Sequence, residues 1–179
     1  SDSASLDNLI ELLSFSNIDI DEIMMMLIPE AWDNDDTMSD SKKSFYEFKS
    51  SIIEPWDGPA AIIYTNGKSI GSILDRNGLR PMRYTITEDN RIILASETGV
   101  LDIEPSNIKE KGNLRSGKIL SIDFTRNKVK FDQEIKNTIC NREPYNTWLK
   151  KNRITADMLP KKKSKFKKIN DLDLERFHK

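Results

Sequence analysis

Residues 55–84, with the sequence PWDGPAAIIYTNGKSIGSILDRNGLRPMRY, carry the clearest strand and turn signals in the chain. Residues 60–65 form a short apolar run that ends at Asn66-Gly67, and residues 68–74 form a second run of strand-like composition. Two such runs joined by Asn-Gly predict a β-hairpin whose tight primed turn has positive φ at both central residues. The stretch therefore predicts a pair of antiparallel strands around which the rest of the chain is organised.

A charged loop with the sequence DRNGLRP, residues 75–81, follows the hairpin directly. It places two arginines, an aspartate, an asparagine and a glycine close together. Clustered charge around a glycine between strands is typical either of a salt-bridged turn or of a loop that presents groups to a ligand. The residue types favour the structural role, and the ligand-facing role is the alternative.

Helical patterns precede the hairpin, and strand patterns follow it. Apolar residues at helical spacing open the chain at Leu6, Leu9, Ile10 and Leu13. Further helices are predicted at residues 19–27, 41–53 and 133–140, with shorter helical segments at 148–151 and 171–177. Strands are predicted at residues 82–87, 91–96, 118–125 and 128–131, and irregular backbone is predicted over 102–117. Helices followed by antiparallel strands define an α+β class.

The second predicted helix contains an unusual run of methionines, Met24 to Met26. Asp19 or Asp21 is expected to cap this helix, since aspartate accepts hydrogen bonds from the free amides of a first turn. Methionine fills irregular gaps in apolar cores, so we expect this run to pack inside the protein.

Composition and charge exclude several classes of protein. The 179 residues include 28 basic and 29 acidic side chains, a net charge of −1, whereas a nucleic-acid binder has a large basic excess. A single cysteine, Cys140, excludes an internal disulfide framework and a cysteine-based zinc site. No apolar run spans a bilayer, and the first residues lack the features of a secretory signal. We therefore expect a cytoplasmic or plastid protein that binds neither nucleic acid nor membrane.

A basic run, KKKSKFKK, lies near the C-terminus at residues 161–168. Such a run is most often a solvated linker or an inter-domain contact. Binding of nucleic acid or of an acidic membrane is the alternative.

The residues alone do not assemble a complete catalytic set. Covalent catalysis needs a nucleophile with a base in reach, and Cys140 has no histidine near it in the sequence. Ser1 has its own α-amine as a base, but it also suits a helix cap. Acidic pairs such as Asp33 and Asp35 lie in a polar loop without histidine, so no metal site is predicted. A phosphate-binding loop of the GxxxxGK type is absent from the sequence.

Six motifs together resemble one known family. They are SDSASLDN (1–8), MMMLIPEAW (24–32), EPWDGPAAI (54–62), LDRNGLRPMRY (74–84), ASETGVLDI (95–103) and PYNTWL (144–149). In this order they resemble the C-terminal part of the amidotransferase domain of the glutamate synthase large subunit. The resemblance covers residues 1–150. Residues 151–179 are expected to be a polar, basic linker or the start of the following region.

The resemblance implies a class II glutamine amidotransferase of the N-terminal-nucleophile type, with a four-layer αββα sandwich of antiparallel sheets. In that family an N-terminal cysteine attacks the side-chain amide of glutamine, with its own α-amine as base. A glutamyl thioester forms, ammonia leaves, and water then releases glutamate. The ammonia serves the reductive amination of 2-oxoglutarate on FMN, with an iron–sulfur cluster nearby. Glutamine is the implied substrate, the rest of the glutamate synthase chain is the implied partner, and both cofactors are expected outside this segment.

Several parts of the family's active site lie upstream of Ser1. They are the nucleophilic cysteine, the arginine that grips the glutamine carboxylate, and an Asn-Gly oxyanion element. We therefore expect this chain alone not to hydrolyse glutamine, and we expect a fragment, a split gene product or a truncated sequence. The alternatives are a non-catalytic interaction module and one half of a split enzyme whose partner carries the cysteine.

The resemblance also identifies candidate site residues. Asp2 matches the carboxylate that binds the α-ammonium of glutamine, and a plain helix cap is its alternative role. The residues that match the DRNGLRP loop are expected to support the site rather than contact the ligand: Asp75, Arg76, Asn77, Gly78 and Arg80. Arg80 and Glu97 are expected to form an ion pair beneath the site, and Trp56 is expected to shape the entry to the first strand.

Overall fold

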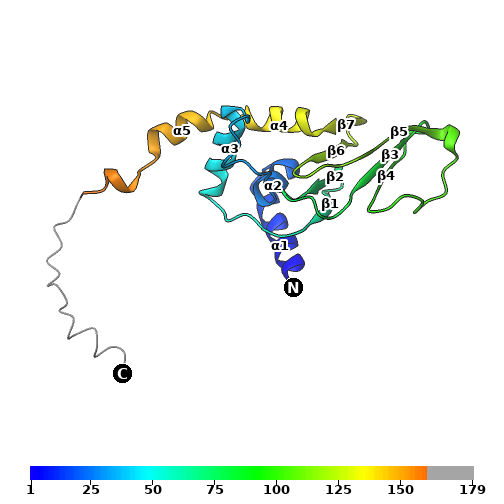
Figure 1. Cartoon of the computed structure of the whole chain (residues 1–179), viewed down its shortest axis with the longest axis horizontal. Coiled ribbons are helices and arrows are strands. Elements are labelled where there is room, and N and C mark those ends of the chain that lie inside the picture. Colours follow the sequence, from blue (N-terminus) through cyan, green and yellow to red (C-terminus); the bar gives the residue numbers. More distant parts are fainter. Residues whose placement is uncertain (161–179) are drawn as a thin grey trace, which may run out of the picture.

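The computed structural model describes residues 1–160, so the basic run 161–168 and the helix predicted at 171–177 lie outside the described residues. The helices are α1 Asp2–Ser14, α2 Ile20–Leu27, α3 Asp40–Ser50, α4 Asp132–Cys140 and α5 Tyr145–Asn152, with 3-10 turns at Pro105–Asn107 and Ala156–Met158. The strands are β1 Ala61–Thr65, β2 Ser69–Leu74, β3 Arg83–Thr87, β4 Ile92–Ala95, β5 Ile108–Asn113, β6 Ile119–Asp123 and β7 Lys128–Phe131. Helices α1 to α3 precede an all-antiparallel set of strands, and α4 and α5 follow it (Figure 1), which confirms the α+β class.

The strands form two antiparallel sheets. The four-stranded sheet has the order β1-β2-β6-β7, and the three-stranded sheet has the order β4-β3-β5. Figure 1 shows the three-stranded sheet and α5 at opposite ends of the long axis of the molecule. The rings of Tyr84 on β3 and Phe131 on β7 lie 5.9 Å apart, so the two sheets meet at the β7 edge.

The predicted hairpin is confirmed, but its turn differs from the prediction. β1 and β2 pair from Ala61↔Leu74 to Thr65↔Ile70. Gly67 has φ +79°, whereas Asn66 is not among the non-glycine residues with positive φ in the described chain. Instead the Oδ1 atom of Asn66 accepts the backbone N–H groups of Lys68 at 3.0 Å and of Ser69 at 2.9 Å. The asparagine therefore closes the turn with its side chain, as an Asx turn does.

The prediction of irregular backbone over residues 102–117 was wrong in part, because β5 forms within it. β5 pairs with β3 from Arg83↔Asn113 to Thr87↔Ile108, with a shift of register between Ile86 and Thr87. Its sequence, IKEKGN, lacks the alternation of apolar and polar residues by which a half-buried strand is recognised. The strand depends on pairing with β3 rather than on a face of its own.

Helix α2 lies at the centre of the core. All eight of its residues are buried, and Ile23, Met24, Met25 and Leu27 have no exposed surface, which confirms the core position of the methionines. Asp19 is the cap, since its side chain accepts the amide of Asp21. Each such apolar side chain contributes about 1.5–3 kcal/mol by leaving water. The helix is thus held by burial along its whole length.

Helix α5 is fixed to α3 by a cluster of aromatic rings. The ring of Tyr145 lies 5.4 Å from the rings of Phe45 and Phe48, and Trp148 lies 5.2 Å from Phe48. Phe45 is fully buried at the centre of this cluster. Aromatic pairs in such arrangements stabilise a core beyond the area that they bury. The motif PYNTWL therefore serves packing.

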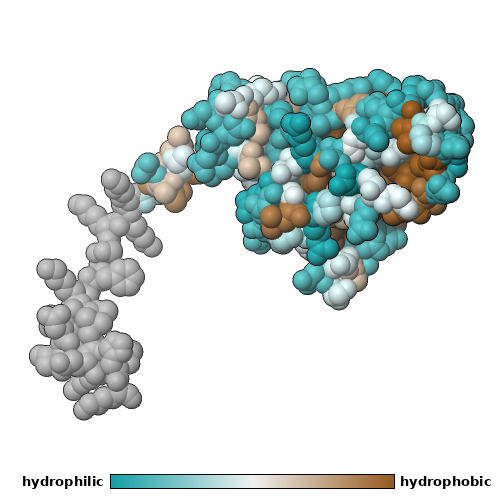
Figure 2. Space-filling view, turned by 45° about the vertical axis from the view of Figure 1, so that its right-hand side comes forward, coloured by the Kyte–Doolittle hydropathy of each residue, from teal (hydrophilic) through white to brown (hydrophobic). Residues whose placement is uncertain are grey.

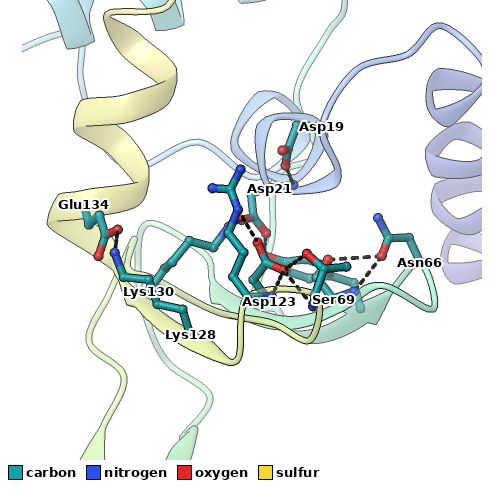
Figure 3. A network of polar contacts seen from close by, with 11 residues as sticks. Asp19, Asp21, Asn66, Ser69, Asp123, Lys128, Lys130 and Glu134 are labelled. Carbon is teal, nitrogen blue, oxygen red and sulfur yellow. Dashed lines mark hydrogen bonds and ion pairs between the residues drawn. The ribbon is translucent and has the colours of Figure 1, made fainter.

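Charged groups also lie buried around α2. The carboxylate of Asp21, which is 2% exposed, accepts hydrogen bonds from the Tyr64 hydroxyl at 2.8 Å and from Lys130 Nζ at 2.9 Å. Figure 3 shows Asp21 at the start of α2, with Lys130 and the neighbouring pair Lys128–Glu134 between the sheet and α4. Burial, and next the charge of Asp21, raise the pKa of Tyr64 well above its ordinary value. The network joins the helical layer to the four-stranded sheet through satisfied partners.

Tyr64 reaches Asp21 by lying across a glycine. A Cβ atom built on Gly71, its partner on β2, would lie 2.3 Å from the ring of Tyr64. The three-stranded sheet repeats this arrangement with Tyr84 over Gly112, where the Tyr84 hydroxyl donates to Glu110 at 3.0 Å. In both sheets a strand glycine provides the space that a tyrosine ring occupies.

Changing Gly71 to alanine is therefore expected to destabilise the fold by about 1–3 kcal/mol, the usual cost of overpacking. The new methyl group displaces the Tyr64 ring and weakens its hydrogen bond to Asp21. Urea unfolding followed by circular dichroism measures the change. Ser72→Ala is the matched control on the same strand, because the buried Ser72 hydroxyl has no hydrogen-bond partner to lose. Equal stability of the two variants would contradict the prediction.

Candidate functional site

A cleft of about 620 Å³ lies between α1 and the edge strand β1. Its walls come from the first turns of α1, from β1 and from the chain that leads into β1. The lining residues of interest there are Asp2, Leu6, Asp7, Ile10, Trp56 and Arg80. Apolar and polar groups line the cleft in similar measure, and the polar ones include two aspartates and one arginine, which suits a small polar ligand.

Asp2 lies in the first turn of α1, on the wall of the cleft. The N-cap of α1 is Ser1, so the alternative role of Asp2 as the cap is not observed. Within residues 1–160, no hydrogen bond or ion pair engages the carboxylate of Asp2, although the positive end of the helix dipole favours its charge. Asp2 is therefore an exposed carboxylate at the start of α1 that has no partner among the described residues and can bind a cation.

The two arginines of the DRNGLRP loop have different surroundings. Arg76 donates to Asp57 at 2.7 Å, and both side chains are largely exposed. Arg80 lines the cleft with Asp2 and has no ion pair within the described part of the chain. The loop therefore contains a salt bridge at Arg76, and Arg80 lines the cleft, while a ligand-binding role for the loop stays a prediction.

The ion pair predicted between Arg80 and Glu97 is not formed. Glu97 instead lines a separate cavity of about 270 Å³, where residues 97–103 cover one face of the three-stranded sheet. Val100 and Leu101 in this segment are each 55% exposed. Figure 2 shows apolar side chains gathered over this end of the molecule. Glu97 thus lies on a different surface from Arg80, because the segment after β4 runs away from the DRNGLRP loop.

Asp75 holds the DRNGLRP loop in place. Its side chain is buried, and its Oδ1 atom accepts the amide of Ala60 at 3.0 Å. Its Oδ2 atom accepts the amides of Asn77 at 2.9 Å and of Gly78 at 3.3 Å. Gly78 has φ +59° and lies so close to Ser116 that a Cβ atom would clash with it. These contacts hold the loop together, and support of a substrate site by Asp75, Asn77 and Gly78 stays a prediction.

Sequence reasoning missed two contributors to the cleft. Trp56 was expected only to shape the strand entry, but its side chain also lines the cleft, while its amide donates to the Leu27 carbonyl at 2.8 Å. Asp7 lines the same wall as Asp2. The available signal was the helical spacing of α1, which places Ser3, Leu6, Asp7 and Ile10 on one face.

Cys140 is not placed for nucleophilic attack. It is 2% exposed at the end of α4, in the apolar core. Burial raises the pKa of its thiol to about 12, so the reactive thiolate is not populated near neutral pH. Residues 1–160 contain no group of three or more His, Cys, Asp or Glu side chains that could hold a metal ion. In the same range no helix has the length and apolar character needed to cross a bilayer.

Cys140 is therefore expected to resist alkylation by iodoacetamide at pH 8 in the folded chain and to react readily in urea. Because the folded pKa lies above the unfolded value, stability is unaffected below about pH 8.5. As pH rises from there through the folded pKa of about 12, deprotonation favours the unfolded chain. Mass spectrometry of the alkylated protein measures the reaction. Rapid labelling of the folded chain at pH 8 would contradict the assignment.

Comparison with known proteins defines the class. Residues 1–148 match the family described as glutamine amidotransferases class-II, and the chain belongs to that family. The resemblance stated from the motifs, with its N-terminal-nucleophile fold class, is thereby confirmed.

The similar proteins within this class are glutamate synthases. The chain is 45% identical over 160 residues to the glutamate synthase [NADPH] large chain of Bacillus subtilis, covering 89% of this chain and 10% of that protein. It is 47% identical over 147 residues to the ferredoxin-dependent glutamate synthase of Pyropia yezoensis, covering 81% and 10%. It is 46% identical over 150 residues to the glutamate synthase [NADH] of Schizosaccharomyces pombe, covering 83% and 7%. The chain therefore spans a tenth or less of the length of these relatives.

Proposed function

We propose that this chain provides the amino-acid-binding wall of the glutaminase site of a glutamate synthase. The observation that carries the proposal is the unpartnered carboxylate of Asp2 on the wall of the 620 Å³ cleft. In this site Asp2 pairs with the α-ammonium of glutamine. A charge-assisted hydrogen bond donated by the α-ammonium to this carboxylate contributes to both the affinity and the orientation of the ligand.

The apolar lining of the cleft supports this role. Leu6, Ile10 and Trp56 line it without competing for the polar groups of glutamine. Arg80 adds a cation to the same cleft, which suits a zwitterionic ligand better than a purely cationic one. The residues of this chain therefore bind and orient the substrate and exclude water from part of its surface.

The attacking group comes from outside the described residues in this proposal. Cys140 is buried and protonated, and the resemblance implies an N-terminal cysteine with its own α-amine as base. That cysteine displaces ammonia from the glutamine side chain, and water then releases glutamate. The chain thus supplies binding and orientation, and another segment or polypeptide supplies the chemistry.

An iron–sulfur cluster does not fit the residues of this chain. An iron–sulfur cluster is held by several thiolates, and this chain has a single cysteine that is buried in its core. We place the cluster and FMN in other parts of a glutamate synthase. FMN would supply the electrons for reductive amination there, and no step in the cleft described here depends on either group.

A chimera with a relative tests the proposed function. Residues 1–148 replace the matching segment of the Bacillus subtilis large chain, to which this chain is 45% identical. The purified chimera is assayed for glutamate formation with glutamine and, separately, with ammonium. We expect glutamine-dependent activity within about tenfold of that of the parent. A chimera that uses ammonium normally but not glutamine would contradict the proposal and favour the non-catalytic interaction module.

A further inference from the structure

A cluster of buried charges lies against the DRNGLRP loop. It contacts the end of the loop that is farther from the cleft. Its centre is Lys136 on α4, which is 2% exposed. The Nζ atom of Lys136 lies 2.9 Å from Glu30 Oε2, 2.7 Å from Asp132 Oδ1 and 2.7 Å from the carbonyl oxygen of Gly117. An ammonium group has three N–H donors, so each has its own acceptor. One of the three is backbone, and this contact connects the cluster to the loop.

Gly117 links Lys136 to Asp75 through two hydrogen bonds made by its backbone. Its N–H donates to the carbonyl oxygen of Asp75 at 2.9 Å, while its own carbonyl accepts from Lys136 at 2.7 Å. It has φ +65°, and a Cβ atom there would lie 2.7 Å from Cβ of Glu30. Glycine has no side chain whose packing could hold the backbone in this conformation. Its orientation therefore depends on these two hydrogen bonds, on the packing of Glu30, and on the turn that the Lys118 amide closes by donating to the Arg115 carbonyl at 3.0 Å.

Asp75 transmits the position of Gly117 to the cleft. Its carbonyl also accepts the amide of Gly78 at 3.1 Å, and its carboxylate accepts the amides of Ala60 and Asn77. Ala60 lines the cleft directly, and Arg80 follows two residues after Gly78 and lines it too. At this end of the loop Asp75 is the buried ionisable residue, because Arg76 is exposed.

We propose that Lys136 is a positioning residue for the amino-acid cleft, because its ammonium group, through Gly117 and Asp75, fixes the loop that brings Arg80 into the cleft. Lys136 does not line the cleft itself. The proposal rests on the proposed function in one respect, namely that the cleft binds the amino acid. Its physical part, the connection from Lys136 to the loop, is independent of the ligand.

Hydrogen exchange tests that physical part in the chain itself. In Lys136→Met, we expect the amides of Asn77, Gly78 and Gly117 to exchange at least tenfold faster, relative to the sheet amides of Ile73 and Ile119. Lys136→Gln retains an N–H donor and should give intermediate rates. It also serves as the test variant if Lys136→Met does not fold.

Lys49→Met is the matched control. Lys49 is also buried, at 8% exposure, and pairs with the buried Glu22, which keeps Arg142 as a second partner. Glu30 likewise keeps Lys42 when Lys136 is changed. We expect less than a twofold change in the relative exchange of the loop amides in this control. Equal acceleration in both variants would overturn the proposal, because it would show only a general loss of stability.

The chimera tests the effect on the cleft. We expect Lys136→Met to raise the KM for glutamine about three- to tenfold, with the ammonium-dependent rate unchanged, while Lys49→Met changes neither. Faster loop exchange without a change in KM would overturn the positioning role. A failure of the proposed function is seen separately, as an absence of any effect of Asp2→Asn on the same KM.

Discussion

Changing Asp2 to asparagine in the chimera is expected to raise the KM for glutamine by about 10- to 100-fold. Hydrogen bonds to charged groups contribute about 1.5–3 kcal/mol, and each 1.4 kcal/mol is a factor of ten in affinity. The substituted side chain keeps the shape of aspartate and loses the charge that pairs with the α-ammonium in the proposed function. The rate with saturating ammonium is expected to stay within about twofold, because ammonium does not use this contact. Steady-state kinetics with each nitrogen donor measure the two effects.

Asp40→Asn is the matched control for this experiment. Asp40 is the first residue of α3, follows a serine N-cap whose side chain caps no backbone amide of the helix, and is exposed, as Asp2 is in α1. It does not line the cleft. Both changes remove an acidic group from the positive end of a helix dipole, a loss of about 0.3–1 kcal/mol of stability. If both variants change the KM for glutamine equally, or if Asp2→Asn reduces the ammonium-dependent rate as well, Asp2 acts only on its helix.

The largest effect on stability is expected from Phe45→Ala, which should lower the free energy of unfolding by about 3–5 kcal/mol. Phe45 has no exposed surface, and its ring packs edge-on against Tyr46 at 5.2 Å and Tyr145 at 5.4 Å. Lys49 Nζ lies 5.7 Å from the same ring. Truncation leaves a cavity between α3 and α5 and removes all three contacts. Urea unfolding should show a midpoint lower by about 1–3 M, given the usual dependence on denaturant.

Phe15→Ala provides the comparison for that measurement. Phe15 is the residue that ends α1, and it is 81% exposed. Its truncation removes the same atoms from a solvent-exposed position. The free energy of unfolding should therefore change by no more than about 0.5 kcal/mol. Similar losses in the two variants would mean that the aromatic cluster around Phe45 is not the packed core described above.

Much of the fold follows from patterns within short segments of the sequence. The hairpin at β1 and β2, the helix around the methionines and the order of helices before strands were all predicted correctly, because burial along each segment is periodic or continuous. β5 was missed because its polar residues take their conformation from pairing with β3. Pairing between distant segments leaves no local pattern to detect.

The candidate site was predicted less completely, and the reason is geometric. The resemblance identified Asp2, and the structure places it on a cleft without an internal partner. The sequence could not distinguish Arg76 from Arg80, which are separated by one tight turn. The turn directs one arginine to Asp57 and the other to the cleft, and it depends on contacts of Asp75 with residues distant in the sequence. The predicted pair of Arg80 with Glu97 failed for the same reason.

The arrangement of Tyr64 over Gly71 limits which amino-acid substitutions these two positions can tolerate. A side chain at position 71 is excluded for as long as a ring occupies the space above it, and the ring is kept there by Asp21. A side chain added at position 71 alone is therefore expected to be destabilising, whereas a smaller residue at position 64 would leave room for one. We expect the two positions to change together. In relatives that lack a tyrosine at position 64, we expect to find residues other than glycine at position 71.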